Sequence, residues 1–361
     1  MPDARALPGL PRRHLLAALL AAGALPARAL PPMRLQFPRD HGSHPALRTE
    51  WWYLTGQAGS GARRFGFQIT FFRSRLDGPQ PLHSRFAAKQ LLFAHAAVTD
   101  LAGRRLWHDQ RIARAGFGIA EASEADADVR LHDWRLWRAQ DASWAGELPG
   151  RDFGLHLRFA ETQPLLLQGR DGLSRKGPQP QQASYYYSLP QLAVSGALVL
   201  QGQRFAIDAA DSRAWMDHEW SEALMHPQAV GWDWIGMNLD DGGALAAFRL
   251  RRADGTALWA GGAFRAAGQA ARSFAPDDVA FTPRRWWLSP ASQARYPVEW
   301  EVATPAGRFT VRTLLDAQEL DSRGNTGAIY WEGLSELCDA QGRRLGLGYL
   351  EMTGYAGALR L

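Results

Sequence analysis

Cysteine and lysine are scarce in this chain of 361 residues. Cys338 is the single cysteine, and Lys89 and Lys176 are the only lysines. One cysteine excludes an intramolecular disulfide and any CxxC metal site, so the core alone must hold the fold. Basic tracts are absent as well, because the arginines are scattered along the sequence, and we expect no nucleic-acid partner.

Several catalytic signatures are also missing. The chain has no GxSxG pentapeptide for a serine nucleophile and no glycine-rich phosphate loop. His218-Glu219 is not completed to the HExxH motif of zinc hydrolases. His41 and His44, near Glu50, offer metal-binding side chains, but we interpret them as structural and expect no metal.

The only long apolar run lies near the N-terminus, where Arg12-Arg13 precede residues 15–25 and Ala27-Arg28-Ala29 follow them. This run is too short for a membrane span, which needs about 20 residues, and the small-x-small triplet is typical of a signal-peptidase site. We interpret residues 1–29 as a removed export signal and expect a periplasmic or secreted protein without a transmembrane anchor. The paired arginines favour the twin-arginine route over the general secretory route.

The predicted signal carries four of the 41 basic and one of the 36 acidic residues, so the mature chain has a net charge of +2. Its length is sufficient for two cores of ordinary domain size. We place an N-terminal domain at residues 30–222 and a C-terminal domain at residues 223–361.

Apolar side chains alternate with other residues in segments 65–71, 153–159 and 296–302. A period of two is typical of half-buried strands, and turn residues separate such segments at short intervals. Segment 52–56 and its hairpin partner are matched in type and order by segment 234–238 and its partner. We therefore predict an all-β protein with two tandem antiparallel β-barrels that meet near residues 221–231.

The segment from Trp215 to Trp220 holds Asp217, His218 and Glu219 between two indoles. Burial among aromatic rings raises the pKa of a carboxylic acid and keeps its proton available near neutral pH. Asp217 is therefore the leading candidate for a general acid, and in an extended strand Glu219 shares its face whereas His218 does not. The alternative is that the three groups form a structural hydrogen-bonded network at a barrel rim.

Aromatic residues give the second chemical indication. We expect an apolar pocket inside the first barrel, lined by Trp51, Trp215, Trp220, Trp232 and Trp234. In the run 185–187, alternation places Tyr185 and Tyr187 on one side of a strand and Tyr186 on the other. We expect Tyr185 and Tyr187 to face the pocket and to act with Asp217 and Glu219.

Four motifs together carry a family resemblance: HPALRTEWWY at 44–53, YYYSLP at 185–190, AWMDHEW at 214–220 and GWDW at 231–234. With them the chain resembles the secreted lipocalin-like proteins grouped with carotenoid 1,2-hydratases (the hydroxyneurosporene synthase family). Within that group it is most similar to the members with export signals, which are hydratases or hydrolases of unassigned substrate.

The resemblance implies two lipocalin-like barrels, no metal or organic cofactor, and acid-catalysed addition of water to a terminal double bond of an apolar, isoprenoid-like molecule. The catalytic aspartate of the family matches Asp217. Trp215 stands where the hydratases have tyrosine, and residues 185–187 replace a His-x-Trp set, so the carotenoid substrate does not carry over. The alternatives are a periplasmic carrier for a hydrophobic ligand and a hydrolase of unknown substrate.

The export signal gives a first prediction. Replacing Arg12 and Arg13 together by lysine should retain the protein in the cytoplasm, because the twin-arginine route requires the arginine pair. Cell fractionation and immunoblotting measure the outcome, with the unchanged chain as control. Export that continues at the wild-type level would instead assign the protein to the general secretory route.

Overall fold

The computed structural model describes residues 29–359. The predicted export signal lies outside these residues, apart from Ala29 at its end. Within residues 29–359 no helix is long and apolar enough to cross a membrane.

The described chain forms two antiparallel sheets and two short 3-10 helices, η1 (Arg39–His41) and η2 (Pro276–Asp278). The first sheet contains β1 (Thr49–Ser60), β2 (Arg63–Arg75), β3 (Gln90–Asp100), β4 (Arg105–Arg114), β5 (Ala120–Ala122), β6 (Asp128–Leu131), β7 (Trp134–Arg138), β8 (Trp144–Pro149), β9 (Phe153–Ala160), β10 (Leu166–Leu167), β11 (Leu173–Arg175), β12 (Ala183–Leu200), β13 (Gln203–Ala206) and β14 (Asp208–Ala223). The second contains β15 (Gly231–Leu239), β16 (Ala244–Arg251), β17 (Ala257–Arg265), β18 (Arg272–Phe274), β19 (Ala280–Leu288), β20 (Arg295–Thr304), β21 (Gly307–Thr313), β22 (Glu319–Ser322), β23 (Ala328–Cys338) and β24 (Arg344–Met352).

The two sheets share the order of their first four strands and their last strand. In the first sheet β1 lies between β2 and β14, the next and the last strand along the chain, and β15 lies likewise between β16 and β24 in the second sheet. Each sheet therefore begins as a four-strand meander whose first strand pairs with the final strand. This shared topology agrees with the internal similarity between segments 52–56 and 234–238.

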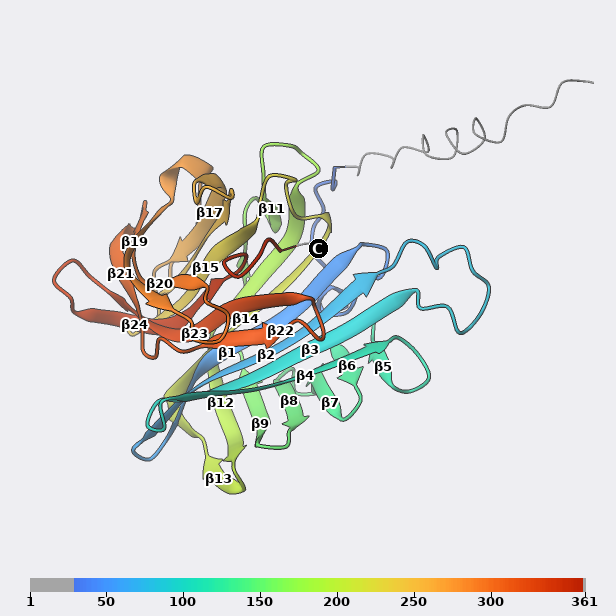
Figure 1. Ribbon diagram of the computed structural model, residues 1–361, viewed down its shortest axis with the longest axis horizontal. Helices are drawn as coiled ribbons and strands as arrows, with labels where there is room; N and C mark the ends of the chain where they lie inside the picture. The colour runs from blue at the N-terminus through green and yellow to red at the C-terminus, as the bar shows by residue number, and fades with distance from the viewer. Residues whose placement is uncertain (1–28, 360–361) are drawn as a thin grey trace, which may run out of the picture.

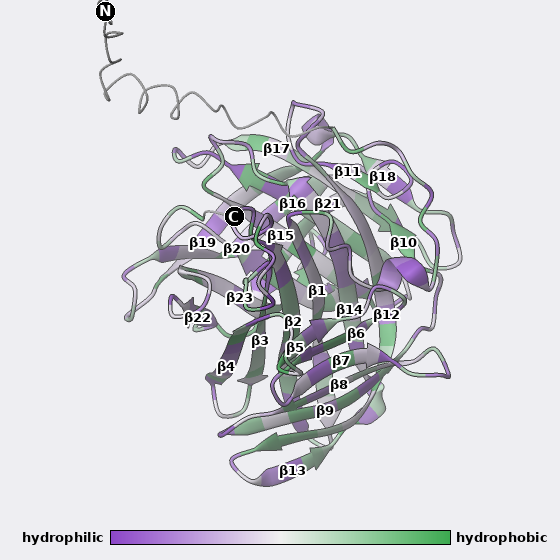
Figure 2. Ribbon diagram, turned by 90° about the vertical axis from the view of Figure 1, so that its right-hand side faces the viewer, coloured by the Kyte–Doolittle hydropathy of each residue, from purple (hydrophilic) through white to green (hydrophobic). Residues whose placement is uncertain are grey.

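The first sheet curls into a nearly closed barrel, because β6 near one end of the strand order contacts β3 and β4 at the other end. Its interior is filled by side chains such as Trp52, Phe67, Phe159 and Trp144. The second sheet encloses a separate core around Trp300 and Trp331. Figures 1 and 2 show the two units packed against each other, with β17 and β13 at opposite ends of the molecule.

The central strands of the first sheet are buried on both faces. On β1, Trp52 and Leu54 point into the barrel, whereas Tyr53 belongs to a third apolar cluster, between the sheets, that includes Trp215 and Trp234. In Figure 1 the red strands β23 and β24 cross over the blue strands β1 and β2. Alternation along β1 therefore separates two buried environments rather than core from solvent.

The all-β fold of lipocalin-like barrels predicted from the sequence is confirmed. The three alternating segments at 65–71, 153–159 and 296–302 lie within β2, β9 and β20.

A buried ionic network anchors the start of the first barrel. Glu50, which is fully buried, accepts hydrogen bonds from Arg73 Nε at 2.7 Å and from the backbone N–H of His44 at 2.9 Å. The imidazoles of His44 and His218 lie 2.7 and 3.1 Å from its Oε1. Although burial opposes the charge, the bonds from His218 and His44 hold the pKa of Glu50 well below its usual range.

Removing a charge from this buried network should lower the free energy of unfolding more than removing one from an exposed ion pair. Glu50→Ala should lower the free energy of unfolding by about 3 to 5 kcal/mol, because it leaves the buried Arg73 guanidinium without its counter-ion. Arg64→Ala, which breaks the exposed Arg64–Asp211 pair, should cost about 1 kcal/mol or less. Urea denaturation at pH 7 measures both, and equal losses would contradict the structural role of Glu50.

Candidate functional site

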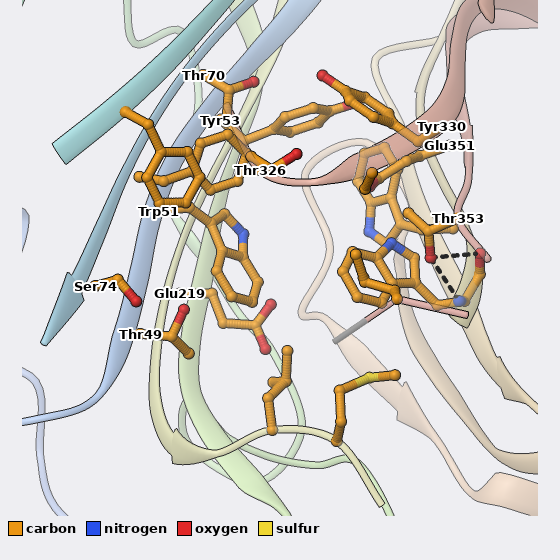
Figure 3. A pocket seen from close by; sticks show the side chains of 18 of the residues that line it. Thr49, Trp51, Tyr53, Thr70, Ser74, Glu219, Thr326, Tyr330, Glu351 and Thr353 are labelled. Carbon is orange, nitrogen blue, oxygen red and sulfur yellow. Dashed lines mark hydrogen bonds between the residues drawn. The ribbon is translucent and has the colours of Figure 1, made fainter. Parts of the chain in front are cut away.

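A cavity of about 600 Å³ lies between the two sheets, walled by β1, β2, β3, β12 and β14 on one side and by β15, β16, β23 and β24 on the other. Figure 3 shows Trp51 and Glu219 on the first wall and Glu351 and Thr353 facing them, with Tyr53 and Tyr330 toward one end. The sequence prediction placed the pocket inside the first barrel. That is wrong, because the interior of the first barrel is packed with apolar side chains and the acid faces outward.

Strand register aligns the residues of the first wall. Asp217 on β14 is paired with Tyr53 on β1, Tyr53 with Thr70 on β2, and Thr70 with His95 on β3. All four residues line the cavity. They form a row across the sheet, and neighbouring strands set a step of about 4.8 Å between its members.

Asp217 lies at one end of this row and is 3 % exposed. Its Oδ1 accepts hydrogen bonds from Ser188 Oγ at 2.5 Å and from Trp215 Nε1 at 2.7 Å. Its Oδ2 accepts one from Tyr186 Oη at 2.6 Å, and that hydroxyl in turn accepts a bond from Trp234 Nε1 at 3.1 Å. The carboxyl group is therefore fixed in orientation by three donors.

Burial and hydrogen bonding act on Asp217 in opposite directions. Burial disfavours the carboxylate, whereas the donors Ser188, Tyr186 and Trp215 favour it, and burial prevails and raises the pKa to about 7. At neutral pH the side chain is therefore divided between acid and carboxylate. It can both give and accept a proton, as a general acid that must be regenerated requires.

Glu219, two residues along β14, lines the same cavity. Lys176 Nζ lies 3.0 Å from its Oε1, and Ser184 Oγ donates to the same oxygen at 2.5 Å. The Lys176 ammonium also lies 4.6 Å from the centre of the Tyr186 ring and 4.1 Å from that of Phe248. The Lys176 ammonium is thus held between two aromatic rings. The hydroxyl group of one of them, Tyr186, donates to Asp217.

Lys176 was missed in the sequence analysis, although a signal for it existed. The chain has 41 basic residues but only two lysines, so a lysine in the polar segment 170–184 is unusual.

The second sheet contributes two further carboxyl groups, Glu332 and Glu351, which are paired on β23 and β24 and line the cavity. Burial raises the pKa of Glu351 to about 8 and that of Glu332 well above its usual range. Sequence reasoning missed both, because Glu351 is the single acidic residue of β24 and Glu332 shares β23 only with Glu336, so neither stands in a cluster of candidate groups.

Alternation in residues 185–187 is present, but the predicted side is wrong. Tyr186 faces the cavity, whereas Tyr185 and Tyr187 belong to the core of the first barrel. Tyr185 Oη donates to the carbonyl of Pro31, and Tyr187 Oη lies 2.7 Å from His41 Nδ1. The reason is that β12, like β1, is buried on both faces, so its outer face holds the site.

The same reversal applies to Trp220. Its indole stacks on the imidazole of His44, with the ring centres 3.9 Å apart, on the barrel face of β14. His218 lies on that face too, whereas Asp217 and Glu219 share the cavity face, as alternation predicted. Trp51, Trp232 and Trp234 line the cavity, and Trp215 contacts Asp217 there.

His44, Glu50 and His218 bring nitrogen and oxygen atoms within 4.8 Å of one another, an arrangement in which a metal ion could be held. Arg73 already supplies a positive charge at 2.7 Å from Glu50, and both imidazoles are hydrogen-bonded to that carboxylate. This donor set fits a structural ionic network better than a metal site. It also lies on the opposite face of β14 from Asp217.

The sequence profile of the AttH-like family matches residues 28–355. The chain belongs to the AttH-like family. A solved AttH-like structure from Nitrosomonas europaea is 44% identical to it, covers 91% of this chain and 99% of its own, and superposes with a TM-score of 0.84. No curated protein sequence matches the chain at a significant level.

Two more distant structures share the fold. Kievitone hydratase from Nectria haematococca is 15% identical, with a TM-score of 0.69 over 90% of this AttH-like chain and 94% of its own. CghA in complex with Sch210972 is 16% identical, with a TM-score of 0.53 over 86% of this chain and 89% of its own.

The pKa of Asp217 predicts a pH-dependent cost of folding. The folded-state pKa of about 7 lies above the ordinary value of 3.8, so the folded protein binds the proton more tightly, and this stabilisation is lost as the pH rises toward 7. From pH 5 to pH 8, the stability of Asp217→Asn relative to wild type should rise by about 2 to 3 kcal/mol.

Chemical denaturation at several pH values measures this difference. Asp211→Asn is the matched control, because Asp211 lies on the same strand with an exposed side chain. An Asp217→Asn difference that stays constant with pH would show that the carboxyl group is ionised throughout.

Proposed function

We propose that this AttH-like protein is a hydratase that adds water to a carbon–carbon double bond of an apolar, isoprenoid-like molecule, with Asp217 as the proton donor. The observation that carries the proposal is a carboxyl group with a pKa of about 7, buried in an aromatic cavity and oriented by three hydrogen-bond donors.

In the proposed reaction, the proton of Asp217 is transferred to one carbon of the double bond, whose π electrons form the new C–H bond. The other, more substituted carbon becomes a carbocation, and the oxygen of a water molecule attacks it. The proton that this water loses passes to the Asp217 carboxylate. Atoms and charge balance, and the acid is restored in each cycle.

The walls of the cavity suit a short-lived cation. Trp51, Tyr53 and Trp234 present ring faces or edges to the space beside Asp217, and attraction between a cation and a desolvated ring is worth on the order of 2 kcal/mol. Glu219 adds a carboxyl group on the same face, where it can position water. Lys176 pairs with Glu219 and contacts the Tyr186 ring, so it positions both neighbours of Asp217.

Two comparisons support this function. The sequence motifs around Asp217 resemble those of carotenoid 1,2-hydratases, and kievitone hydratase has the same fold. The proposed export signal assigns the reaction to the periplasm or the outside of the cell. A hydrophobic-ligand carrier would use the same cavity but would have no need for an acid with a pKa near 7.

A hydratase with Asp217 as its acid should lose activity when the proton of this side chain is removed. Asp217→Asn preserves the size of the side chain but cannot donate to an alkene, so hydration should fall by at least about 100-fold while ligand binding persists. Incubation with isoprenoid alkenes in water enriched in oxygen-18, followed by mass spectrometry, detects the product. Asp211→Asn on the same strand should retain wild-type turnover.

A protein that binds isoprenoids but never incorporates labelled oxygen would be a carrier. An Asp217→Asn variant with full turnover would move the acid role to another carboxyl group of the cavity, and Glu351→Gln is the next variant to examine.

A further inference from the structure

The end of the cavity away from Asp217 contains polar atoms that the hydratase chemistry does not use. Gln68 and His95 are 2 % and 3 % exposed and line the cavity, yet Gln68 Oε1 and His95 Nε2 have no hydrogen-bond partner among the described residues. Glu332 Oε2 and Tyr53 Oη, which line it too, also lack a partner of ordinary geometry, although these two side chains lie near each other. Buried polar atoms are rarely left unpaired, because each costs about 1 to 3 kcal/mol.

The hydroxyl of Tyr330 organises this group. It lies 2.6 Å from His95 Nδ1 and accepts a hydrogen bond from Gln68 Nε2 at 3.4 Å. Gln68 Nε2 donates to Thr70 Oγ1 as well, at 2.9 Å, which fixes the orientation of the amide and leaves Oε1 as a free acceptor. Sequence analysis indicated none of these residues, because they come from three strands of two different sheets.

The same bonds determine the tautomer of His95. Burial lowers the pKa of this imidazole to about 3, so it is neutral near pH 7. Tyr330 Oη has two hydrogen-bond partners among the described residues, and since the Gln68 N–H can only donate, His95 Nδ1 is the one acceptor for the Tyr330 proton. The proton of the neutral ring is then on Nε2, which is a donor without a partner.

One donor without a partner, on β3, and one acceptor without a partner, on the neighbouring strand β2, therefore line the same end of the cavity. A hydroxyl group satisfies both, since its oxygen accepts from His95 Nε2 and its proton is donated to Gln68 Oε1. A carbonyl or ether oxygen satisfies only His95, and a hydrocarbon satisfies neither. The arrangement therefore selects for an alcohol or phenol.

We infer that Gln68, His95 and Tyr330 form a hydroxyl-binding subsite, and that the substrate is an unsaturated alcohol whose double bond lies at Asp217 when its hydroxyl lies at His95. This substrate class rests on the proposed function, whereas the subsite itself does not. Asp217 and His95 are three strands apart in one register row, a separation of about 14 Å. Allowing for contact distances, the hydroxyl and the double bond are on the order of 10 Å apart.

Farnesol and β-farnesene provide a matched pair of probes, because both carry the same terminal trisubstituted double bond and only farnesol has a hydroxyl group. Calorimetric titration of the full mature chain carrying Asp217→Asn measures binding without turnover. Farnesol should bind about tenfold more tightly than β-farnesene, the effect expected for one to two hydrogen bonds to buried partners. A ratio near one between the two affinities would refute the hydroxyl-binding subsite.

Two substitutions in this Asp217→Asn chain locate the hydroxyl. Gln68→Leu removes the free acceptor with little change in volume, and Tyr330→Phe removes the group that orients Gln68 and His95. Each should reduce the preference for farnesol to about twofold or less while β-farnesene binding persists, which shows that the cavity is intact. Ser74→Ala is the control, because Ser74 lines the cavity on the same strand but three rows away from Gln68.

If Ser74→Ala abolishes the preference while Gln68→Leu and Tyr330→Phe retain it, the hydroxyl binds elsewhere and the subsite is refuted. The two proposals fail separately. If the protein with Asp217 intact prefers farnesol but hydrates no alkene, the subsite is supported and the hydratase function is refuted. If it hydrates alkenes but does not prefer farnesol, the hydratase function is supported and the subsite is refuted.

Discussion

Burial of both faces of the central strands is the constraint on which the site depends. Strands β1, β12 and β14 contribute one set of side chains to the first barrel and the alternate set to the contact with the second sheet. A lone barrel would leave Asp217 facing water, where its pKa would be ordinary. The second sheet removes that water, and the desolvation makes this carboxyl group chemically useful.

The two faces of the paired strands β1 and β14 show how buried carboxyl groups serve different ends. On the barrel face, Glu50 of the neighbouring strand β1 is as deeply buried as Asp217, but the guanidinium of Arg73 compensates its charge, and two imidazoles lie within hydrogen-bonding distance of it. On the cavity face, Asp217 receives only neutral donors, while the cation of Lys176 is bound to Glu219. Ion pairing therefore makes Glu50 a structural carboxylate on one face, and the lack of a cation beside Asp217 among residues 29–359 leaves it as the proposed proton donor on the other.

Alternation along the sequence predicted the strands and the division of β14 into two faces, but not which face holds the site. In Tyr185-Tyr186-Tyr187 the pattern is symmetrical, and only the packing of a second sheet distinguishes the inner pair from Tyr186. Trp220 was misplaced for the same reason. Glu332, Glu351 and Tyr330 carried no local signal, because their importance comes from strands that meet Asp217 only in the folded protein.

The two sheets contribute different parts of the cavity because of this geometry. The first sheet holds a rigid row from Asp217 to His95, whose spacing is set by the backbone and does not depend on flexible side chains. The second sheet supplies the opposing wall and the Tyr330 hydroxyl that fixes the far end. Changes in the second sheet can therefore alter which molecule fits without moving the acid.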